Sequence, residues 1–184
     1  MFIVSKLEEK KINSVEYYRN SFLYIHEDDV RLPDGNESKR IVVTHVGAVS
    51  VIALTAEKEL LLVRQYRYPL GRETIESPAG KLEPDEAPIV TAKRELEEET
   101  GYTCEDLEHL GTHATAPGFT NEVLHQFLAK GVSKMEVPVS GDEDEFTEVL
   151  TANKDQALMM IATGEIMDLK TIYAIHYLTL AGLW

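Results

Sequence analysis

The sequence predicts a mixed α/β sandwich with a small antiparallel β unit at its N-terminal end. Residues 46–55 form a nearly continuous apolar run typical of a buried strand, and residues 59–66 are predicted to form another strand. A helical segment follows at 86–100, and two more helical segments come near the C-terminal end. Strands surrounding one central helix, with further helices after them, favour a sandwich of sheet and helices.

The N-terminal β unit is predicted from two strands and the turn between them. Residues 21–26 (SFLYIH) and 40–45 (RIVVTH) have strand composition, and residues 32–36 (LPDGN) form a strong turn signal between them. We therefore expect domains at 1–45 and 46–184.

The elements of the second domain follow from local signals. Residues 73–76 are predicted to form a short extended strand, and residues 77–80 (SPAG) are predicted to break it. Gly101 is well placed to end the central helix. The core-facing stripe of this helix is predicted to consist of Ile89, Ala92 and Leu96. Further strands are expected at 106–114, 123–130 and 146–150, and helices at 154–163 and 167–180.

Composition narrows the classes of function. The chain has 184 residues and a formal net charge of −14, which disfavours nucleic acid and anionic membranes as partners. Cys104 is the single cysteine, so there is neither an intramolecular disulfide nor a cysteine-based zinc site. No apolar run is long enough to span a membrane, and residues 1–14 lack a secretory pattern. We therefore expect a cytoplasmic location.

The central helix carries a cluster of carboxylates. Glu95, Glu98 and Glu99 are three or four residues apart or adjacent, so they lie on one side of the helix. Carboxylates held this close repel one another, and a doubly positive ion among them would relieve the repulsion. Hard oxygen ligands of this kind suit Mg²⁺, Mn²⁺ or Ca²⁺.

Residues 80–102 (GKLEPDEAPIVTAKRELEEETGY) resemble the Nudix box, G-x5-E-x7-R-E-U-x-E-E-x-G-U, where U is a bulky aliphatic residue. Tyr102 is the one departure from the pattern, and we expect it to affect packing more than chemistry. The matching positions are Gly80, Glu86, Arg94, Glu95, Leu96, Glu98, Glu99 and Gly101.

Other segments resemble the ADP-ribose pyrophosphatase branch of this superfamily. They are 64–67 (RQYR), 76–80 (ESPAG), 117–122 (PGFTNE) and 143–149 (EDEFTEV), with Pro117 sixteen residues after Gly101. The resemblance implies an α/β/α sandwich with a mixed sheet. It also implies hydrolysis of the diphosphate bond of ADP-ribose, giving AMP and ribose 5-phosphate.

The resemblance assigns roles to the residues of the box. Glu95, Glu99 and the backbone carbonyl of Ala79 are expected to coordinate Mg²⁺, for which Mn²⁺ can substitute. Glu98 is expected to act in catalysis, either by sharing the metal or by holding metal-bound water. Behind these ligands, Arg94 is expected to pair with a glutamate, and Glu86 is the candidate.

The resemblance also implies residues outside the box. A late-loop glutamate helps to activate water, and Glu145 is the first candidate for it, with Glu143 the alternative. Arg67 and Arg40 are the candidates for contacts with phosphate or base, and Glu122 is the candidate for a contact with the terminal ribose. Glu76, at the entry to the box, is a further expected substrate contact.

Alternatives remain open at this level. Side chains around base and sugar set specificity, so another small nucleoside diphosphate sugar such as GDP-mannose is a possible substrate. A second hypothesis is a Nudix-like sensor that binds a nucleotide without cleaving it, although such proteins often lose box glutamates. The resemblance further implies a homodimer in which the N-terminal unit is exchanged between subunits.

Overall fold

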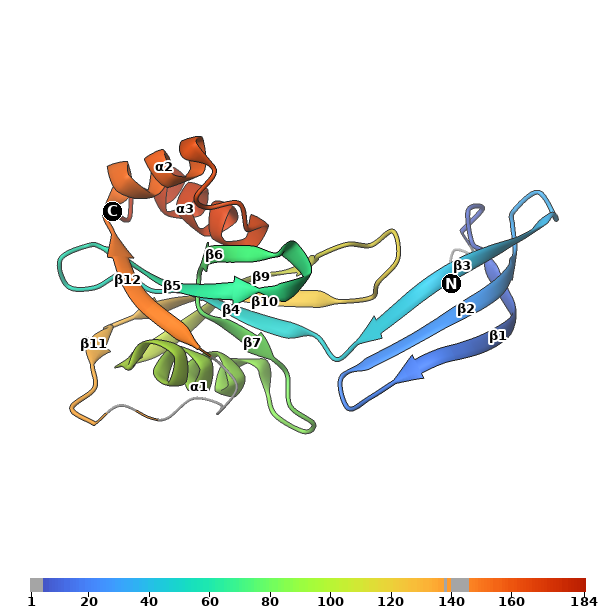
Figure 1. Cartoon of the computed structure of the whole chain (residues 1–184), viewed down its shortest axis with the longest axis horizontal. Helices are drawn as coiled ribbons and strands as arrows, with labels where there is room; N and C mark the ends of the chain where they lie inside the picture. Colours follow the sequence, from blue (N-terminus) through green and yellow to red (C-terminus); the bar gives the residue numbers. More distant parts are fainter. Residues whose placement is uncertain (1–4, 138, 140–145) are drawn as a thin grey trace. The chain divides into compact units, whose positions relative to one another are not determined.

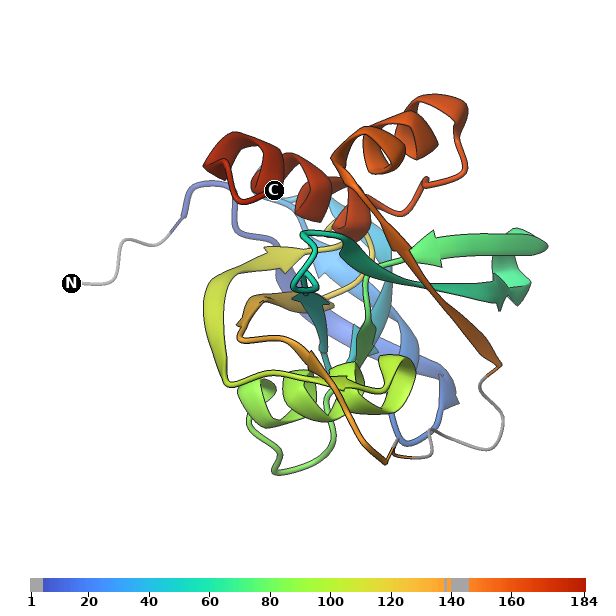
Figure 2. The same cartoon turned by 90° about the vertical axis from the view of Figure 1, so that its left-hand side faces the viewer.

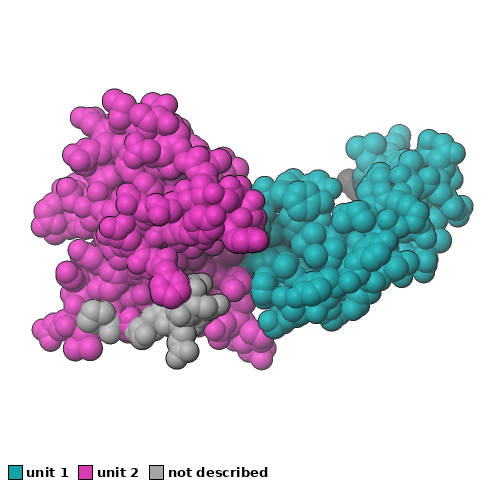
Figure 3. Space-filling view, viewed as in Figure 1, with its two compact units in different colours: residues 1–47, 114–123 teal, residues 48–113, 124–184 magenta. Residues whose placement is uncertain are grey.

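The chain divides into two compact units, which are coloured separately in Figure 3. Unit 1 comprises Met1–Gly47 with Ala114–Val123, and unit 2 comprises Ala48–His113 with Leu124–Trp184. The division into domains 1–45 and 46–184 stays a prediction about folding and dimerisation. The structure is a computed structural model that describes residues 5–137, 139 and 146–184.

Unit 1 contains a three-stranded antiparallel sheet (Figure 1). Its strands, in spatial order, are β1 (Lys10–Arg19), β2 (Leu23–Arg31) and β3 (Glu37–His45). Strands β2 and β3 are the predicted pair, and the predicted turn joins them with Gly35 at φ 91°. The sequence does not predict β1, because KKINSVEYYR lacks a regular apolar alternation and nearly all of it is exposed.

The loop with the Pro117-Gly118 pair belongs to unit 1, where it lies along β3. The Val43 N–H donates to the Phe119 carbonyl over 2.8 Å. The His45 N–H donates to Asn121 Oδ1, also over 2.8 Å. The loop is therefore fixed to the edge of the sheet by backbone and side-chain hydrogen bonds.

Unit 2 holds the remaining strands and the three α-helices of the described chain. A four-stranded sheet has the order β7-β4-β10-β9, and smaller sheets have the orders β12-β5-β6 and β11-β8. Strand β10 runs parallel to β4, whereas β7 runs antiparallel to it, so the predicted mixed sheet is confirmed. The elements are β4 (Ala48–Ile52), β5 (Leu60–Arg67), the 3-10 turn η1 (Tyr68–Leu70), β6 (Arg72–Glu76), β7 (Ala79–Lys81), α1 (Pro88–Thr100), β8 (Tyr102–Thr103), β9 (Asp106–Ala114), β10 (Val123–Lys130), β11 (Ser133–Lys134), β12 (Thr147–Ala152), α2 (Lys154–Thr163) and α3 (Leu169–Ala181).

Two apolar clusters fill unit 2, one on each face of its strands. Alternate residues of β5 illustrate this: Leu60 and Leu62 pack with α2 and α3, whereas Leu61 packs with α1. Figures 1 and 2 show α1 on one side of the strands and α2 with α3 on the other. The near-continuous apolar runs are explained by burial on both faces, and the predicted α/β/α sandwich is confirmed.

The predicted break after residue 76 is confirmed, because β6 ends at Glu76. The sequence did not predict that Ala79 and Gly80 begin β7, where they pair with Ser50 and Val49 of β4. The expectation for Ile89 is wrong. Ile89 is 46% exposed instead of joining Ala92 and Leu96 in the core. It lies in the first turn of α1, where it lines a cavity.

Candidate active site

Helix α1 presents both apolar and acidic side chains to the interior. Proline occupies its first turn, and Gly101 ends it in the left-handed conformation at φ 69°. Ala92 and Leu96 are fully buried, and Glu95 and Glu99 are each only 8% exposed. The two glutamates lie one turn apart, so the helix places both carboxylates in the same partly enclosed space.

Strand β7 lies directly against these two carboxylates. The Ala79 N–H donates to Glu99 Oε2 over 2.9 Å. At Gly80, an added Cβ would lie 1.9 Å from Cδ of Glu95, so only glycine leaves room for that carboxyl group in its present place. The glycine that opens the box is thus explained by a close approach of backbone to carboxylate.

Arg94 is shared by three carboxylates. Its Nη1 donates to Glu95 Oε1 over 2.8 Å and to Glu98 Oε2 over 2.9 Å. Its Nη2 donates to Glu86 Oε2 over 3.2 Å, so the structure contains the pair expected from the sequence and adds two more partners. Thr91 Oγ1 also donates to Glu86 Oε2. Arg94 therefore supplies positive charge beside carboxylates that would otherwise repel one another.

Electrostatics within this cluster favours the charged forms. Burial by itself would lower the pKa of Arg94, but hydrogen bonds to Glu86 and Glu98 and the charge of Glu95 raise it above its usual range. Conversely, hydrogen bonds from Arg94 lower the pKa of the Glu86 carboxyl. At neutral pH the guanidinium and its Glu86 partner are therefore ionised.

The donor atoms of the cluster are those that hard divalent cations prefer. Carboxylate oxygens on α1 and the peptide of Ala79 meet at one place, and space there depends on the absence of a side chain at Gly80. Among residues 5–137, 139 and 146–184, however, no three acidic, histidine or cysteine side chains are grouped as a metal site. Glu95 and Glu98 instead contact Arg94.

A second charged network lies where β5, β6 and α3 meet. Arg67 donates to both carboxylate oxygens of Glu76, each over 2.8 Å. Lys170 also binds Glu76, and its Nζ lies 3.1 Å from Asp168 Oδ1. Thr74 Oγ1 donates to the same carboxylate. Arg67 and Glu76, two predicted substrate contacts, are thus paired with each other.

Glu76 is nearly inaccessible, with an exposed fraction of 3%. Burial by itself would raise the pKa of its carboxyl, but hydrogen bonds from Arg67 and the charge of Lys170 outweigh burial and lower it to about 2. Direct contact between Glu76 and a substrate stays a prediction.

The sequence did not point to the partners of Glu76 on α3. Lys170 is 94 positions away from Glu76 in the sequence, and no short motif links the two. Asp168 has the residue type of a helix N-cap, and its side chain does accept from the Thr171 N–H over 3.0 Å. That signal could have located the start of the helix, but not its contact with β6.

Two further predicted substrate contacts, Arg40 and Glu122, lie in unit 1. Arg40 binds Glu9 through Nε and Nη2, over 2.9 and 2.7 Å. Glu122 accepts a hydrogen bond from Thr115 Oγ1 over 2.6 Å, and its Oε1 lies 3.4 Å from His45 Nδ1. Both candidates therefore have partners inside unit 1, and their roles stay predictions.

The two candidates for the catalytic base, Glu145 and Glu143, lie outside the described residues. Their assignment stays a prediction from the sequence.

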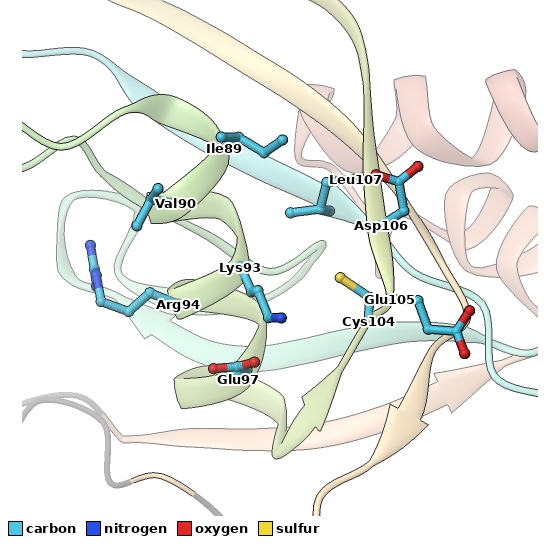
Figure 4. A pocket seen from close by; sticks show the side chains of 9 residues that line it. All are labelled: Ile89, Val90, Lys93, Arg94, Glu97, Cys104, Glu105, Asp106 and Leu107. Carbon is cyan, nitrogen blue, oxygen red and sulfur yellow. The ribbon is translucent and has the colours of Figure 1, made fainter.

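A cavity of about 400 Å³ lies beside α1, between that helix and residues 104–107 (Figure 4). Arg94 reaches its edge, but Glu95, Glu98 and Glu99 do not line it, so it is distinct from the carboxylate cluster. Burial raises the pKa of the Cys104 thiol there, which favours the neutral form. Cys104 is a buried free thiol.

The fold and the carboxylate helix define a Nudix-type protein. A family model described as "NUDIX domain" matches residues 44–167, and the chain belongs to this family. A solved structure described as "Crystal structure of ADP compounds hydrolase" has the same fold, with a TM-score of 0.82 and 18% identity over 98% of this chain and 99% of that one.

Two curated relatives resemble the chain over nearly its whole length. The "Methanol dehydrogenase activator" of Bacillus methanolicus is 49% identical over 94% of each chain. The "ADP-ribose pyrophosphatase" of Bacillus subtilis (strain 168) is 45% identical over 96% of each chain. In the part of the chain that the structure describes, none of the helices is long and apolar enough to cross a membrane.

Proposed function

We propose that this protein is a divalent-metal-dependent diphosphatase that hydrolyses ADP-ribose to AMP and ribose 5-phosphate. Water adds across the P–O–P bridge: its oxygen bonds to one phosphorus, and the bridging oxygen leaves with the other phosphate. The observation that carries the proposal is that two box carboxylates, Glu95 and Glu99, pack against β7. The similarity to an ADP-ribose pyrophosphatase over 96% of both chains supports the choice of substrate.

Glu95, Glu98, Glu99 and the Ala79 carbonyl are the proposed ligands of Mg²⁺, or of Mn²⁺ in its place. The bound ion would offset charge on the diphosphate and lower the pKa of attacking water. To contribute ligand oxygens, Glu95 and Glu98 would turn from Arg94, which now holds both of them. Arg94, still paired with Glu86, would remain as the fixed positive group behind the ligands.

The remaining roles follow from the family resemblance. Glu145, or Glu143 in its place, would accept a proton from the attacking water, and Glu98 would share in that activation. Arg67 would contact phosphate or base from the edge of its pair with Glu76, because its side chain is 40% exposed. Arg40 and Glu122 would contact the nucleotide and the terminal ribose.

The proposed partners are small nucleoside diphosphate sugars and a second copy of the chain. In unit 1, Val15, Glu27 and Ile41 are cross-strand neighbours, so they share one face of the sheet. Tyr18 belongs to the same face, and Val15, Ile41 and Tyr18 are each about half exposed. Covering this face with the same unit of another subunit would remove apolar surface from water, which supports a dimer.

A substrate panel tests the proposed activity directly. The protein would be incubated with Mg²⁺ and ADP-ribose, GDP-mannose, ADP-glucose, NADH or a diadenosine polyphosphate, and the products identified by chromatography. AMP and ribose 5-phosphate formed fastest from ADP-ribose support the proposal. Faster cleavage of GDP-mannose would move the assignment to that substrate. Tight ADP-ribose binding without turnover in any divalent metal would identify a sensor.

A second candidate function comes from the relative named for activating methanol dehydrogenase, which is 49% identical to this chain. The protein would then act on a dehydrogenase as well as, or instead of, a free nucleotide. Adding it to a methanol dehydrogenase assay, with and without Mg²⁺, separates the two functions. A rise in dehydrogenase rate with intact protein supports this candidate, and an unchanged rate removes it.

A further inference from the structure

The first turn of α3 contacts the short segment that leads into β7. We call this segment, residues 76–80, the ligand loop. Thr171 is fully buried, and its Oγ1 accepts a hydrogen bond from the Ser77 N–H over 2.7 Å. The same hydroxyl donates to Asp168 Oδ2 over 2.6 Å, so its orientation is fixed from both sides.

The preceding residue of α3 binds the same loop one position earlier. Lys170 pairs with Glu76, and only 13% of its side chain is exposed. Asp168 contacts both Lys170 and Thr171, so the side chains of these three residues are linked to one another. Two adjacent positions of the ligand loop are therefore held by two adjacent positions of α3.

The far end of the ligand loop contacts the proposed metal ligands. Ala79 follows Ser77 by two residues and donates its N–H to Glu99. Gly80 comes next, and its Cα lies against the carboxyl group of Glu95. A shift of the loop at Ser77 would thus be transmitted through two peptide units to Glu99 and through three to Glu95.

Strand β4 also supports this loop. The Val51 N–H donates to the Pro78 carbonyl over 2.9 Å, and Ala79 pairs with Ser50. The other end of the loop pairs with β5, where Glu76 is the partner of Val63, and Thr171 and Lys170 add side-chain contacts at Ser77 and Glu76. If β4 were sufficient, removing the α3 contacts would lower stability without changing the metal site.

We propose that the first turn of α3, through Thr171 and Lys170, positions the ligand loop and so sets the affinity of the carboxylate cluster for divalent metal. Both residues are positioning residues, because they act through their contacts with Ser77 and Glu76. The inference rests on the proposed function, since it assumes that the cluster binds metal.

The test compares Thr171→Val, which removes the hydroxyl at nearly constant volume, with Thr171→Ser, which keeps it. Mn²⁺ binding is measured by the loss of the free-ion electron paramagnetic resonance signal. We expect about tenfold weaker binding in Thr171→Val, as for other residues that orient metal ligands. Thr171→Ser should bind within about twofold of the unsubstituted protein. At saturating metal, kcat should fall more than KM rises.

Thr179→Val is the matched control on the same helix. Its hydroxyl donates to the Ile175 carbonyl over 2.7 Å and does not contact the ligand loop, so Mn²⁺ affinity should not change. Unchanged affinity in Thr171→Val, with only a lower melting temperature, would overturn the proposal. Equal loss in the Ser and Val variants would also overturn it.

A second variant covers the case in which Thr171→Val does not fold. Lys170→Gln leaves Glu76 bound to Arg67 and Thr74, so the fold should persist. About threefold weaker Mn²⁺ binding is expected, and unchanged binding would overturn the proposal. If the unsubstituted protein binds Mn²⁺ but cleaves no diphosphate, the proposed function fails while these binding comparisons still decide the inference.

Discussion

Unit 1 and unit 2 solve the problem of burying polar groups in different ways. In unit 1 the buried side chains include His26 and Asp28, and Val30 is the neighbouring apolar one on β2. In unit 2 two extensive apolar clusters surround a few buried acids, among them Glu76 and Glu95. The difference teaches that unit 2 has the packed surroundings in which charged groups can be held for chemistry.

The buried acid of unit 1 depends on immediate neighbours within the sheet. Burial by itself would raise the pKa of Asp28, but hydrogen bonds from Ser14, Lys11 and His26 lower it to about 2. Those partners come from β1 and β2 alone. The corresponding acid of unit 2, Glu76, draws its partners from β5, β6 and α3, so it links elements that are far apart in sequence.

The largest effect is expected from Glu99→Gln, which tests whether the buried acids of unit 2 carry the proposed diphosphatase activity. The amide oxygen can still accept from the Ala79 N–H, so the fold and melting temperature should change little. Loss of a charged ligand should lower kcat at least about 100-fold, equivalent to roughly 3 kcal/mol or more.

Steady-state kinetics with ADP-ribose and Mg²⁺ measure that effect. Glu97→Gln on the same helix is the control, because Glu97 lies beside the cavity and accepts from Thr103. A rate for Glu99→Gln equal to that of the control would contradict the assignment of the ligands.

The next largest effect is expected from Gly80→Ala. The new Cβ would lie 1.9 Å from Cδ of Glu95 and must displace that flexible side chain. Mn²⁺ affinity should fall about tenfold or more, by analogy with other changes that misplace metal ligands. Calorimetric titration with Mn²⁺ provides the measurement.

A double-mutant cycle identifies the cause. In a Glu95→Ala background the clash is gone, so adding Gly80→Ala should no longer change the melting temperature. An equal loss of stability in both backgrounds would show that the strain comes from the backbone instead.

Glu76→Gln tests the charged network by its dependence on pH. The folded-state pKa of Glu76 is about 2, against an ordinary value of 4.5, so its charge adds about 3 kcal/mol of stability at pH 7. Because the folded pKa is depressed, this stability is present above pH 4.5 and is lost as the pH falls towards 2. Chemical denaturation should therefore show that the unsubstituted protein has a larger free energy of unfolding than Glu76→Gln at pH 7, and that this difference shrinks as the pH falls from 4.5 towards 2.

The control for that measurement is Glu148→Gln, which breaks an exposed pair with Arg64. Exposed pairs contribute at most about 1 kcal/mol, so its loss should be small at every pH. If the loss of unfolding free energy in Glu76→Gln stayed constant from pH 7 to 2, the charge of Glu76 would not be the source of the stabilisation.

The smallest effect on the chain itself is expected from Ile41→Lys in unit 1. Ile41 is 50% exposed, so the monomer should lose less than about 1 kcal/mol. Dimerisation through this face should weaken at least about tenfold, which sedimentation equilibrium can measure. Leu180→Lys, at an exposed site on α3, should leave the mass unchanged. Identical masses for both variants would remove this face as the dimer surface.

Much of the fold follows from patterns that are local in the sequence. The apolar runs that became β4 and β5, and the helix ended by Gly101, were predictable because burial and chain reversal leave strong local signals. Strand β1 was missed because its side chains are exposed, so pairing with β2 leaves no apolar period. Strand β7 was missed because proline and glycine suggested a break.

For the candidate site, the spacing of residues on α1 predicted that Glu95, Glu98 and Glu99 share one side of a helix. The pairing of Arg94 with Glu86 was also predictable, because Arg94 lies on the box helix and Glu86 lies at the start of the same segment. The four-residue spacing makes Arg94 and Glu98 neighbours on the helix, but only the structure shows that Arg94 binds both Glu98 and Glu95. Spacing along a helix determines which side chains are neighbours, whereas the side-chain rotamers determine which of those neighbours form hydrogen bonds.

By itself the sequence determined the sandwich class and the cluster of acids on one helix, because both depend on periodicity over a few turns or strands. The family followed from the resemblance of residues 80–102 to a known motif. Only the tertiary structure decided that Gly80 must approach Glu95 and that Thr171 and Lys170 support the ligand loop. Those contacts join segments that are up to 94 residues apart, and no local propensity records them. They arise from packing α1 and α3 against the same strands, where burial favours hydrogen-bond partners for polar groups.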